Sequence, residues 1–309
     1  MHVALYFHGR LPVQGYGGTQ RVIVWLARGL AQLGHEVTLL AARGSKLREA
    51  RVVELDPRAV HRSEFDLTPF LPPKLDILHA HAPLARPPAC AHVRTLHGNL
   101  APGTPAPANT VYLSADHALR HGGRAFVYNG VDPSELDFRL VKADYDLFLG
   151  RLHSVKGYRW AIAGAQRAGH RLVIAGGWRP SFRRSLRFVG SVDGARKADL
   201  LAGAACLWMP ALWSEPFGLT LIEAMMSGTP VLGTTRGALP EIVSPEVGAL
   251  GETLEELIEL RPSIEQRDPH ACRARAERWF SHRVMAESYV RMYRAYLEGQ
   301  VLPPGLRAT

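Results

Sequence analysis

Residues Glu215–Glu223 have the sequence Glu-Pro-Phe-Gly-Leu-Thr-Leu-Ile-Glu and place two carboxylates around the predicted start of a helix. Pro216 disfavours a helical conformation at Glu215, so Glu215 is predicted to lie on the loop before the helix. Gly218 has no Cβ and therefore lets the backbone come close to a ligand. The helix is predicted to end just before Gly228, because glycine suits the position that follows a helix.

The first turn of this helix is suited to a phosphate. The backbone amides near Leu219 and Thr220 have no helical partner and point outward. Glu223 lies about one turn inside the helix and still faces the same pocket. This arrangement suits a sugar at one carboxylate, a ribose at the other and a diphosphate between them. The alternative is two ordinary carboxylates that the helix dipole favours at a helix terminus.

Short apolar runs alternate with amphipathic stretches along the chain, which is typical of βα units on a parallel sheet. A helix is predicted over Thr19–Leu33 with Thr19 as its N-cap, and a long helical region at the end of the chain is predicted to break near residues 280–282. The 309 residues exceed what one core usually holds, so we predict two domains, residues 1–135 and 136–280. The predicted strands are Val3–Phe7, Glu36–Ala41, Ile77–His81, Arg94–His97, Val111–Ser114, Ala125–Tyr128, Leu147–Leu149, Leu172–Ala175, Phe188–Gly190, Cys206–Met209 and Pro230–Gly233.

The composition limits the classes of molecule that the protein is expected to bind. The chain has 37 basic and 28 acidic residues, and its formal net charge of +9 favours anionic ligands. Nucleic acid is not expected, because no known binding motif and no basic stripe interleaved with aromatic residues is present. The odd number of cysteines, Cys90, Cys206 and Cys272, predicts a reducing compartment and no cysteine-based metal site. No apolar segment is long enough to span a bilayer. We predict a cytoplasmic protein and leave a peripheral contact with the inner membrane face open.

A glycine-rich loop, Gly15–Gly18, lies between the first predicted strand and the first predicted helix. Ligands bind to open parallel sheets at this place, and Gly17 and Gly18 let the backbone approach a phosphate. The glycine spacing does not match that of a dinucleotide site. A flexible turn is an equal alternative for this motif.

A second loop of this kind, Gly150–Gly157, contains Arg151 and Lys156. Two cations at this place suit a diphosphate and the charge that develops as it leaves. His97 ends a predicted strand and is either structural or catalytic. His79 and His81 lie two residues apart on a strand and share a face, and we interpret them as structural because no carboxylate or cysteine stands at ligand spacing.

The stretch Glu215–Glu223 resembles the E-x7-E motif of family 4 glycosyltransferases, which are retaining enzymes of GT-B fold. Gly15–Gly18, His97 and the G-R-x4-K-G pattern of Gly150–Gly157 are similar to further signatures of this family, in the same order along nearly the whole chain. The resemblance implies an α/β protein of GT-B fold, with two Rossmann-like domains facing across a cleft. It also implies that the last helix, residues 281–298, returns to the first domain.

The resemblance implies a role for each motif residue. Arg151 and Lys156 bind the donor phosphates, and His97 contacts the transferring sugar. Glu215 binds hydroxyls of the donor sugar and helps with positive charge at the anomeric carbon, while Glu223 bonds to the ribose hydroxyls. The predicted catalytic residues are thus His97, Glu215, Arg151 and Lys156. The predicted donor-binding residues are Gly17, Gly18, Arg151, Lys156, Phe217, Gly218, Leu219, Thr220 and Glu223.

The resemblance implies a hexosyltransferase that moves a sugar from a nucleotide-diphosphate sugar to an acceptor hydroxyl with retention. The nucleotide-sugar is a substrate, no cofactor is required, and no divalent ion is implied, because no Asp-x-Asp metal motif stands where enzymes of the other major fold carry one. Two alternatives stay open: a GT-B epimerase or phosphorylase, and a nucleotide-binding regulatory protein with a dead site. The donor base and sugar, the oligomeric state and the acceptor (a sugar, a lipid-linked molecule or a natural product) are not specified by these residues.

Overall fold

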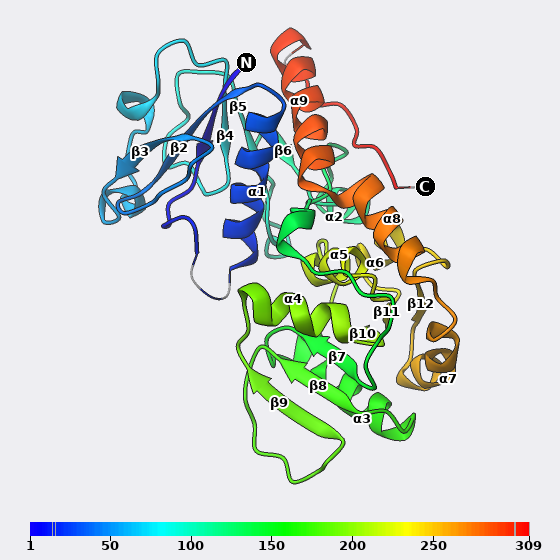
Figure 1. The fold of residues 1–309 in the computed structure, drawn as a ribbon. Coiled ribbons are helices and arrows are strands. Elements are labelled where there is room, and N and C mark those ends of the chain that lie inside the picture. Colours follow the sequence, from blue (N-terminus) through cyan, green and yellow to red (C-terminus); the bar gives the residue numbers. More distant parts are fainter. Residues whose placement is uncertain (14, 16, 300, 309) are drawn as a thin grey trace. The chain divides into compact units, whose positions relative to one another are not determined.

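The computed structural model describes residues 1–13, 15, 17–299 and 301–308. The chain divides into two compact units, one formed by Met1–Gly130 with His282–Arg307 and one formed chiefly by Val131–Ser281. Each unit contains a six-stranded sheet whose paired strands are parallel (Figure 1). The predicted alternation of strands and helices is therefore confirmed in both units.

The sheet of the first unit has the order β3-β2-β1-β4-β5-β6. All residues of β1 are buried, as expected for a central parallel strand covered on both faces. The strands are β1 (His2–Tyr6), β2 (Glu36–Ala42), β3 (Arg51–Leu55), β4 (Ile77–Ala80), β5 (His92–Thr95) and β6 (Thr110–Val111), and the helices are α1 (Gly18–Gln32), η1 (Ala59–His61), η2 (Thr68–Phe70), α2 (Ala115–Arg120) and α9 (His282–Gly299).

Helix α9 packs along α1, so the last helix returns to the first unit as predicted (Figure 1). Gly29 of α1 makes this approach possible, because a Cβ there would lie 2.7 Å from the carbonyl oxygen of His282 and 2.8 Å from the Cβ of Ala286. The N-cap of α1 is Gly17, and the prediction of Thr19 was wrong. Thr19 lies within the first turn because the helix begins at Gly18, directly after the glycine-rich loop.

The sheet of the second unit has the order β12-β11-β10-β7-β8-β9. Its core lies under β7, β8 and β10 and includes Phe148, Ile174 and Trp208. The strands are β7 (Asp146–Leu149), β8 (Leu172–Ala175), β9 (Leu186–Gly190), β10 (Cys206–Met209), β11 (Val231–Thr234) and β12 (Gly248–Gly251), and the helices are η3 (Pro133–Glu135), η4 (Ser154–Lys156), α3 (Tyr158–Arg167), α4 (Gly194–Gly203), α5 (Leu219–Met226), α6 (Leu239–Ile242), α7 (Leu254–Ile264) and α8 (Pro269–Phe280).

The sequence pattern missed the edge strands β3 and β12 and predicted one strand too many. Residues 125–128 do not form a strand, because β6 ends at Val111 and leaves Phe126 a single isolated bridge to Tyr112. Strand β3 is exposed at Arg51 and Glu54, so it lacks the apolar run that marks buried strands. The predicted helix break is found at Ser281, between α8 and α9.

A buried ion pair joins α7 to β7. The guanidinium of Arg261 donates to both carboxylate oxygens of Asp146, with Nη2–Oδ1 and Nε–Oδ2 distances of 2.6 and 2.9 Å. The indole of Trp208, on β10, donates to Asp146 Oδ2 at 2.7 Å. Burial by itself lowers the pKa of Arg261, but the hydrogen bonds and charge of Asp146 outweigh burial and raise it. Asp144 is exposed and only 3.7 Å from Arg171, so Asp144 and Asp146 do not offer one ion a shared Asp-x-Asp site.

We expect Arg261→Met to destabilise the second unit by about 3–5 kcal/mol, because it leaves the Asp146 carboxylate buried without its charged partner. Chemical denaturation followed by tryptophan fluorescence measures this loss. The matched control is Arg167→Met, which removes the exposed Arg167–Glu255 pair and should cost less than about 1 kcal/mol. Equal losses in the two variants would mean that the buried Arg261–Asp146 pair stabilises the unit no more than the exposed pair does.

Candidate active site

The loop from Gly150 to Gly157 connects β7 to α3 and is held against the end of β10. The amide of Leu212 donates to the carbonyl of Val155 at 2.8 Å. Gly157 has a φ of 71°, and a Cβ there would lie 1.7 Å from the carbonyl oxygen of Pro210. Only glycine permits this approach, so the end of the G-R-x4-K-G motif is a packing constraint that positions the residue before it.

That residue, Lys156, meets Glu215. Lys156 Nζ lies 2.6 Å from Glu215 Oε2, and the indole of Trp213 donates to the same oxygen at 2.9 Å. The ammonium group also lies 4.8 Å from the centroid of the Trp213 ring. The structure therefore brings together two predicted catalytic residues that lie far apart in the sequence.

The backbone of Glu215 is held by Gly237 and Ala238, which belong to no motif that the sequence analysis identified. The amide of Ala238 donates to the carbonyl of Glu215 at 2.9 Å. Gly237, with a φ of 65°, lies so close that a Cβ would be 2.3 Å from the oxygen and 2.4 Å from the nitrogen of Glu215. Gly237 therefore positions the carboxylate, and its place just after the apolar run of β11 was the only signal in the sequence.

Helix α5 begins where the sequence predicts. Gly218 is its N-cap with a φ of 93°, and this glycine has no side chain to cap the amides of the first turn. Leu219 and Thr220 are half-buried, and the hydroxyl of Thr220 donates to the sulfur of Met209 at 3.8 Å. Phe217 is buried and packs edge-on against Phe280 at a centroid distance of 6.1 Å. The predicted phosphate-binding turn is thus anchored by Phe217.

Glu223 pairs with a buried lysine that was not predicted. Lys197 Nζ, from α4, lies 2.5 Å from Glu223 Oε1. The two residues are 7% and 3% exposed, so each compensates a charge that is largely removed from water. Lys197 lies one turn before the buried Leu201 on the same face of α4, which was the available signal in the sequence.

Arg151 lies two residues after the end of β7 and is exposed. Its loop touches the one after β8, because a Cβ on Gly176 would lie 2.2 Å from the carbonyl oxygen of Gly150. Trp178, in the loop after β8, is 69% exposed. The loops after β7 and β8 therefore lie side by side within the second unit.

In the first unit, Gly17 and Gly18 end the glycine-rich loop and begin α1. A Cβ on Gly17 would lie 2.9 Å from both methyl groups of Val13, so this glycine allows the loop to fold over Val13. The guanidinium of Arg21 donates to the carbonyl of Gly15 at 2.9 Å. Tyr16, the other member of the loop motif, lies outside the described residues.

His97 belongs to a cluster of neutral histidines. Its Nε2 lies 2.9 Å from Nδ1 of His81, and the rings of His81 and His79 are 4.0 Å apart. His79 is bonded in turn to Thr95 at 2.7 Å and to the hydroxyl of Tyr293 on α9 at 2.6 Å. The prediction that His79 and His81 share a face agrees with these contacts.

Desolvation lowers the pKa of His97 to about 4, and it lowers the pKa of His79 and His81 well below the ordinary value. At neutral pH His97 therefore offers hydrogen bonds and not a positive charge. His117 holds Gly98, the residue after His97, because Nε2 of His117 lies 3.2 Å from the carbonyl oxygen of Gly98. Desolvation lowers the pKa of His117 to about 3.

No cluster of three or more His, Cys, Asp or Glu that could hold a metal ion occurs in the part of the chain that the structure describes. Nor does any described helix have both the length and the apolar character needed to cross a bilayer.

We expect Gly237→Ala to lower the free energy of unfolding by about 1–3 kcal/mol more than Gly169→Ala. Both glycines have positive φ, but a Cβ at Gly169 meets open space, so the comparison isolates the collision with the backbone of Glu215. Thermal unfolding of the two variants measures the difference. Equal losses would mean that Gly237 does not constrain Glu215.

We expect the first unit to lose stability as the pH falls. The folded pKa of His117, about 3, lies below the value of about 6.5 in the unfolded chain, so the unfolded state binds more protons below pH 6.5. The stability is complete above that pH, and His117 alone removes on the order of 2 kcal/mol at pH 5. Unfolding measured from pH 7 to 5 should show a shallower slope for His117→Asn than for the native chain, and an equal slope would contradict this expectation.

The chain matches known glycosyltransferases in sequence. Residues 144–259 match the family model described as Glycosyl transferases group 1. An uncharacterized glycosyltransferase of Methanocaldococcus jannaschii is 31% identical over 40% of this chain and 39% of its own length. A glycogen synthase of Mycobacterium tuberculosis is 29% identical over 57% of this chain and 50% of its own length. The matched region thus spans half or less of the length of these two relatives.

The fold extends the likeness over nearly the whole chain. The crystal structure of AviGT4, a glycosyltransferase involved in avilamycin A biosynthesis, is similar with a TM-score of 0.80 and 29% sequence identity. The likeness covers 96% of this chain and 98% of that one. The parallel sheets and the AviGT4 structure support the GT-B fold that the sequence motifs predict, and the family model and the relatives show that the chain is similar to glycosyltransferases.

Proposed function

We propose that the protein transfers a sugar from a nucleotide-diphosphate sugar to an acceptor hydroxyl, with retention at the anomeric carbon. The observation that carries this proposal is the contact between Lys156 and Glu215 in the second unit. Lys156, which we assign to the leaving phosphate, lies beside Glu215, which we assign to the sugar, and both residues belong to loops at the carboxyl ends of parallel strands.

In this proposal the donor diphosphate binds to Arg151, Lys156 and the first-turn amides of α5. An ammonium group has three hydrogen-bond donors, so Lys156 can keep its bond to Glu215 and still donate to a phosphate. Trp213 and Lys156 together orient the Glu215 carboxylate, as a role beside a developing positive charge requires. Lys197 does the same for Glu223 at the ribose.

We propose that the leaving phosphate oxygen takes the proton of the acceptor hydroxyl as the new glycosidic bond forms on the same face. Negative charge then builds on the diphosphate, where Arg151 and Lys156 stabilise it, and no resident divalent ion is needed. His97 contributes a hydrogen bond to the transferring sugar in its neutral form, consistent with its lowered pKa.

Binding of UDP, GDP, ADP and TDP, and of their sugars, tests the donor site by the rise in unfolding temperature. We expect one nucleotide to stabilise the native chain and Glu255→Gln, a control at an exposed carboxylate. Glu223→Gln combined with Lys197→Met should abolish that rise, and this pair removes both buried charges so that neither is left uncompensated. A rise that survives in the double variant would contradict the assignment of Glu223 to the ribose.

With the donor known, we expect Lys156→Met to lower kcat by about 10²–10³-fold, because it removes stabilisation that matters most as the diphosphate leaves. The matched control Arg167→Met changes a cation outside the site and should keep the native kcat. The anomeric proton of the first product, followed by NMR, tests retention. An inverted product would rule out the proposed mechanism, and release of an epimerised or phosphorylated sugar would favour the alternative reactions.

A further inference from the structure

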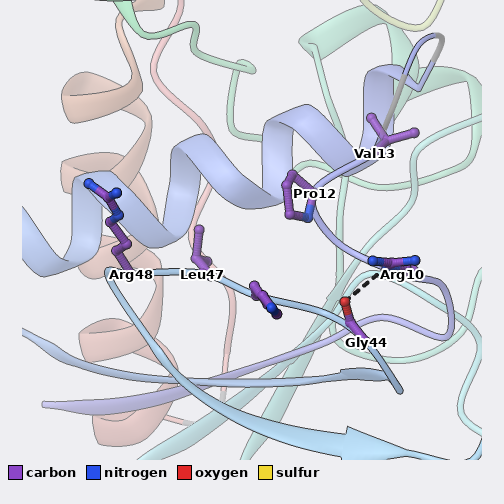
Figure 2. Close-up of a pocket in the computed structure, with 7 residues that line it drawn as sticks. Arg10, Pro12, Val13, Gly44, Leu47 and Arg48 are labelled. Atoms are coloured by element: carbon purple, nitrogen blue, oxygen red, sulfur yellow. Dashed lines mark hydrogen bonds between the residues drawn. The ribbon is translucent and has the colours of Figure 1, made fainter.

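The first unit contains a pocket of about 710 Å³, within the range of small-molecule sites. It lies between residues 10–13, which follow β1, and residues 44–48, which follow β2 (Figure 2). Strands β1 and β2 are parallel neighbours, so the pocket stands at the carboxyl edge of the sheet, where ligands bind to this class of fold. The lining residues are Arg10, Pro12, Val13, Gly44, Lys46, Leu47 and Arg48.

The pocket carries an uncompensated positive charge. Arg10, Lys46 and Arg48 are exposed, and none forms an ion pair with a carboxylate among the described residues. Of the two nearby carboxylates in the sequence, Glu49 pairs with Arg28 at 3.1 Å, and Glu54 accepts from the amide of the lining residue Gly44 at 2.7 Å. One carboxylate thus lies beside three cations, and the balance stays positive. Like charges gathered in one concave site attract an anion.

The walls of the pocket are fixed by hydrogen bonds between its two segments. The amide of Leu11 donates to the buried hydroxyl of Ser45 at 3.0 Å, and the amide of Lys46 donates to the carbonyl of Leu11 at 2.9 Å. Nε of Arg10 donates to the carbonyl of Gly44 at 2.9 Å (Figure 2). This bond orients the guanidinium and uses none of its terminal nitrogens. A site held in this way loses little entropy when it binds a ligand.

The lining also has an apolar part. Figure 2 shows Leu47 between Arg10 and Arg48, with Pro12 and Val13 on the facing segment. Arginine recognises phosphate with two parallel hydrogen bonds, and the apolar side chains offer contact to a carbon skeleton. This combination suits a molecule that joins a phosphate to a less polar body.

We infer that this pocket binds an acceptor that carries a phosphate group. The inference rests on the proposed sugar transfer, in which the donor phosphates are bound by Arg151, Lys156 and α5 of the second unit. Gly17 and Gly18, the donor-binding residues predicted in the first unit, do not line this pocket, so we assign the anion of the pocket to the other substrate. The hydroxyl to be glycosylated lies on the acceptor outside the pocket, while the phosphate is held by the positive charge of the lining.

The test is binding of mannose 6-phosphate to the full chain at low salt by calorimetry, with mannose as the uncharged comparison. We expect the phosphorylated sugar to bind and Lys46→Gln with Arg48→Gln to weaken its binding at least tenfold. Arg58→Gln with Arg62→Gln removes the same charge from exposed positions of this unit outside the pocket and should change the affinity less than twofold. Neither double variant should alter the rise in unfolding temperature that the nucleotide gives.

Each other outcome overturns the inference in an identifiable way. Equal weakening in the two double variants would mean attraction by the overall charge and not by the pocket. Equal affinity for glucuronate would mean that the pocket binds any anion and does not recognise phosphate. Binding only to phosphatidylglycerol vesicles would mean that the pocket contacts a membrane surface and not an acceptor. If the nucleotide stabilises the chain but mannose 6-phosphate does not bind, this inference alone fails. If the nucleotide does not bind either, the proposed transfer fails first.

Discussion

The carboxylate of Asp146 ties together the elements that carry the candidate site of the second unit. It is fully buried and accepts hydrogen bonds from Arg261 on α7 and from Trp208 on β10. Strand β7, which begins at Asp146, leads into the loop of Lys156, and β10 leads into the segment of Glu215. One buried acid thus sets the relative position of two strands whose loops meet in the Lys156–Glu215 pair. The core of this unit and its chemistry share a single anchor.

The ionisable groups at the predicted site residues are arranged in opposite ways in the two units. In the second unit each glutamate is matched by one lysine, so the unliganded site has its charges balanced in pairs. In the first unit His79, His81 and His97 are kept neutral by desolvation. A lysine–glutamate pair combines two opposite charges, whereas the neutral rings hold a pattern of hydrogen bonds without charge.

The sequence predicted those parts of the structure that depend on patterns of neighbouring residues. The start of α5 at Gly218, the loop of Arg151 and Lys156, and the alternation of strands and helices all depend on neighbouring residues, and the structure has them where the patterns place them. Lys197 and Gly237 were missed because their importance comes from contacts with residues 26 and 22 positions away. Spacing within a motif does not encode such contacts. Strand β3 was missed because an edge strand needs no continuous apolar run.

The path of the chain has a consequence for the order in which the protein is made. The second unit starts and finishes at neighbouring points, since the amide of Val131 donates to the carbonyl of Phe280 at 2.9 Å. The first unit, by contrast, needs Tyr289 and Tyr293 of α9 to complete the hydrogen bonds around Thr95 and His79. On the ribosome, the half translated first is therefore completed last. Part of the core of residues 1–130 stays uncovered until α9 has been made. By then the second unit, which lies between residues 1–130 and α9 in the sequence, already has all of its own strands.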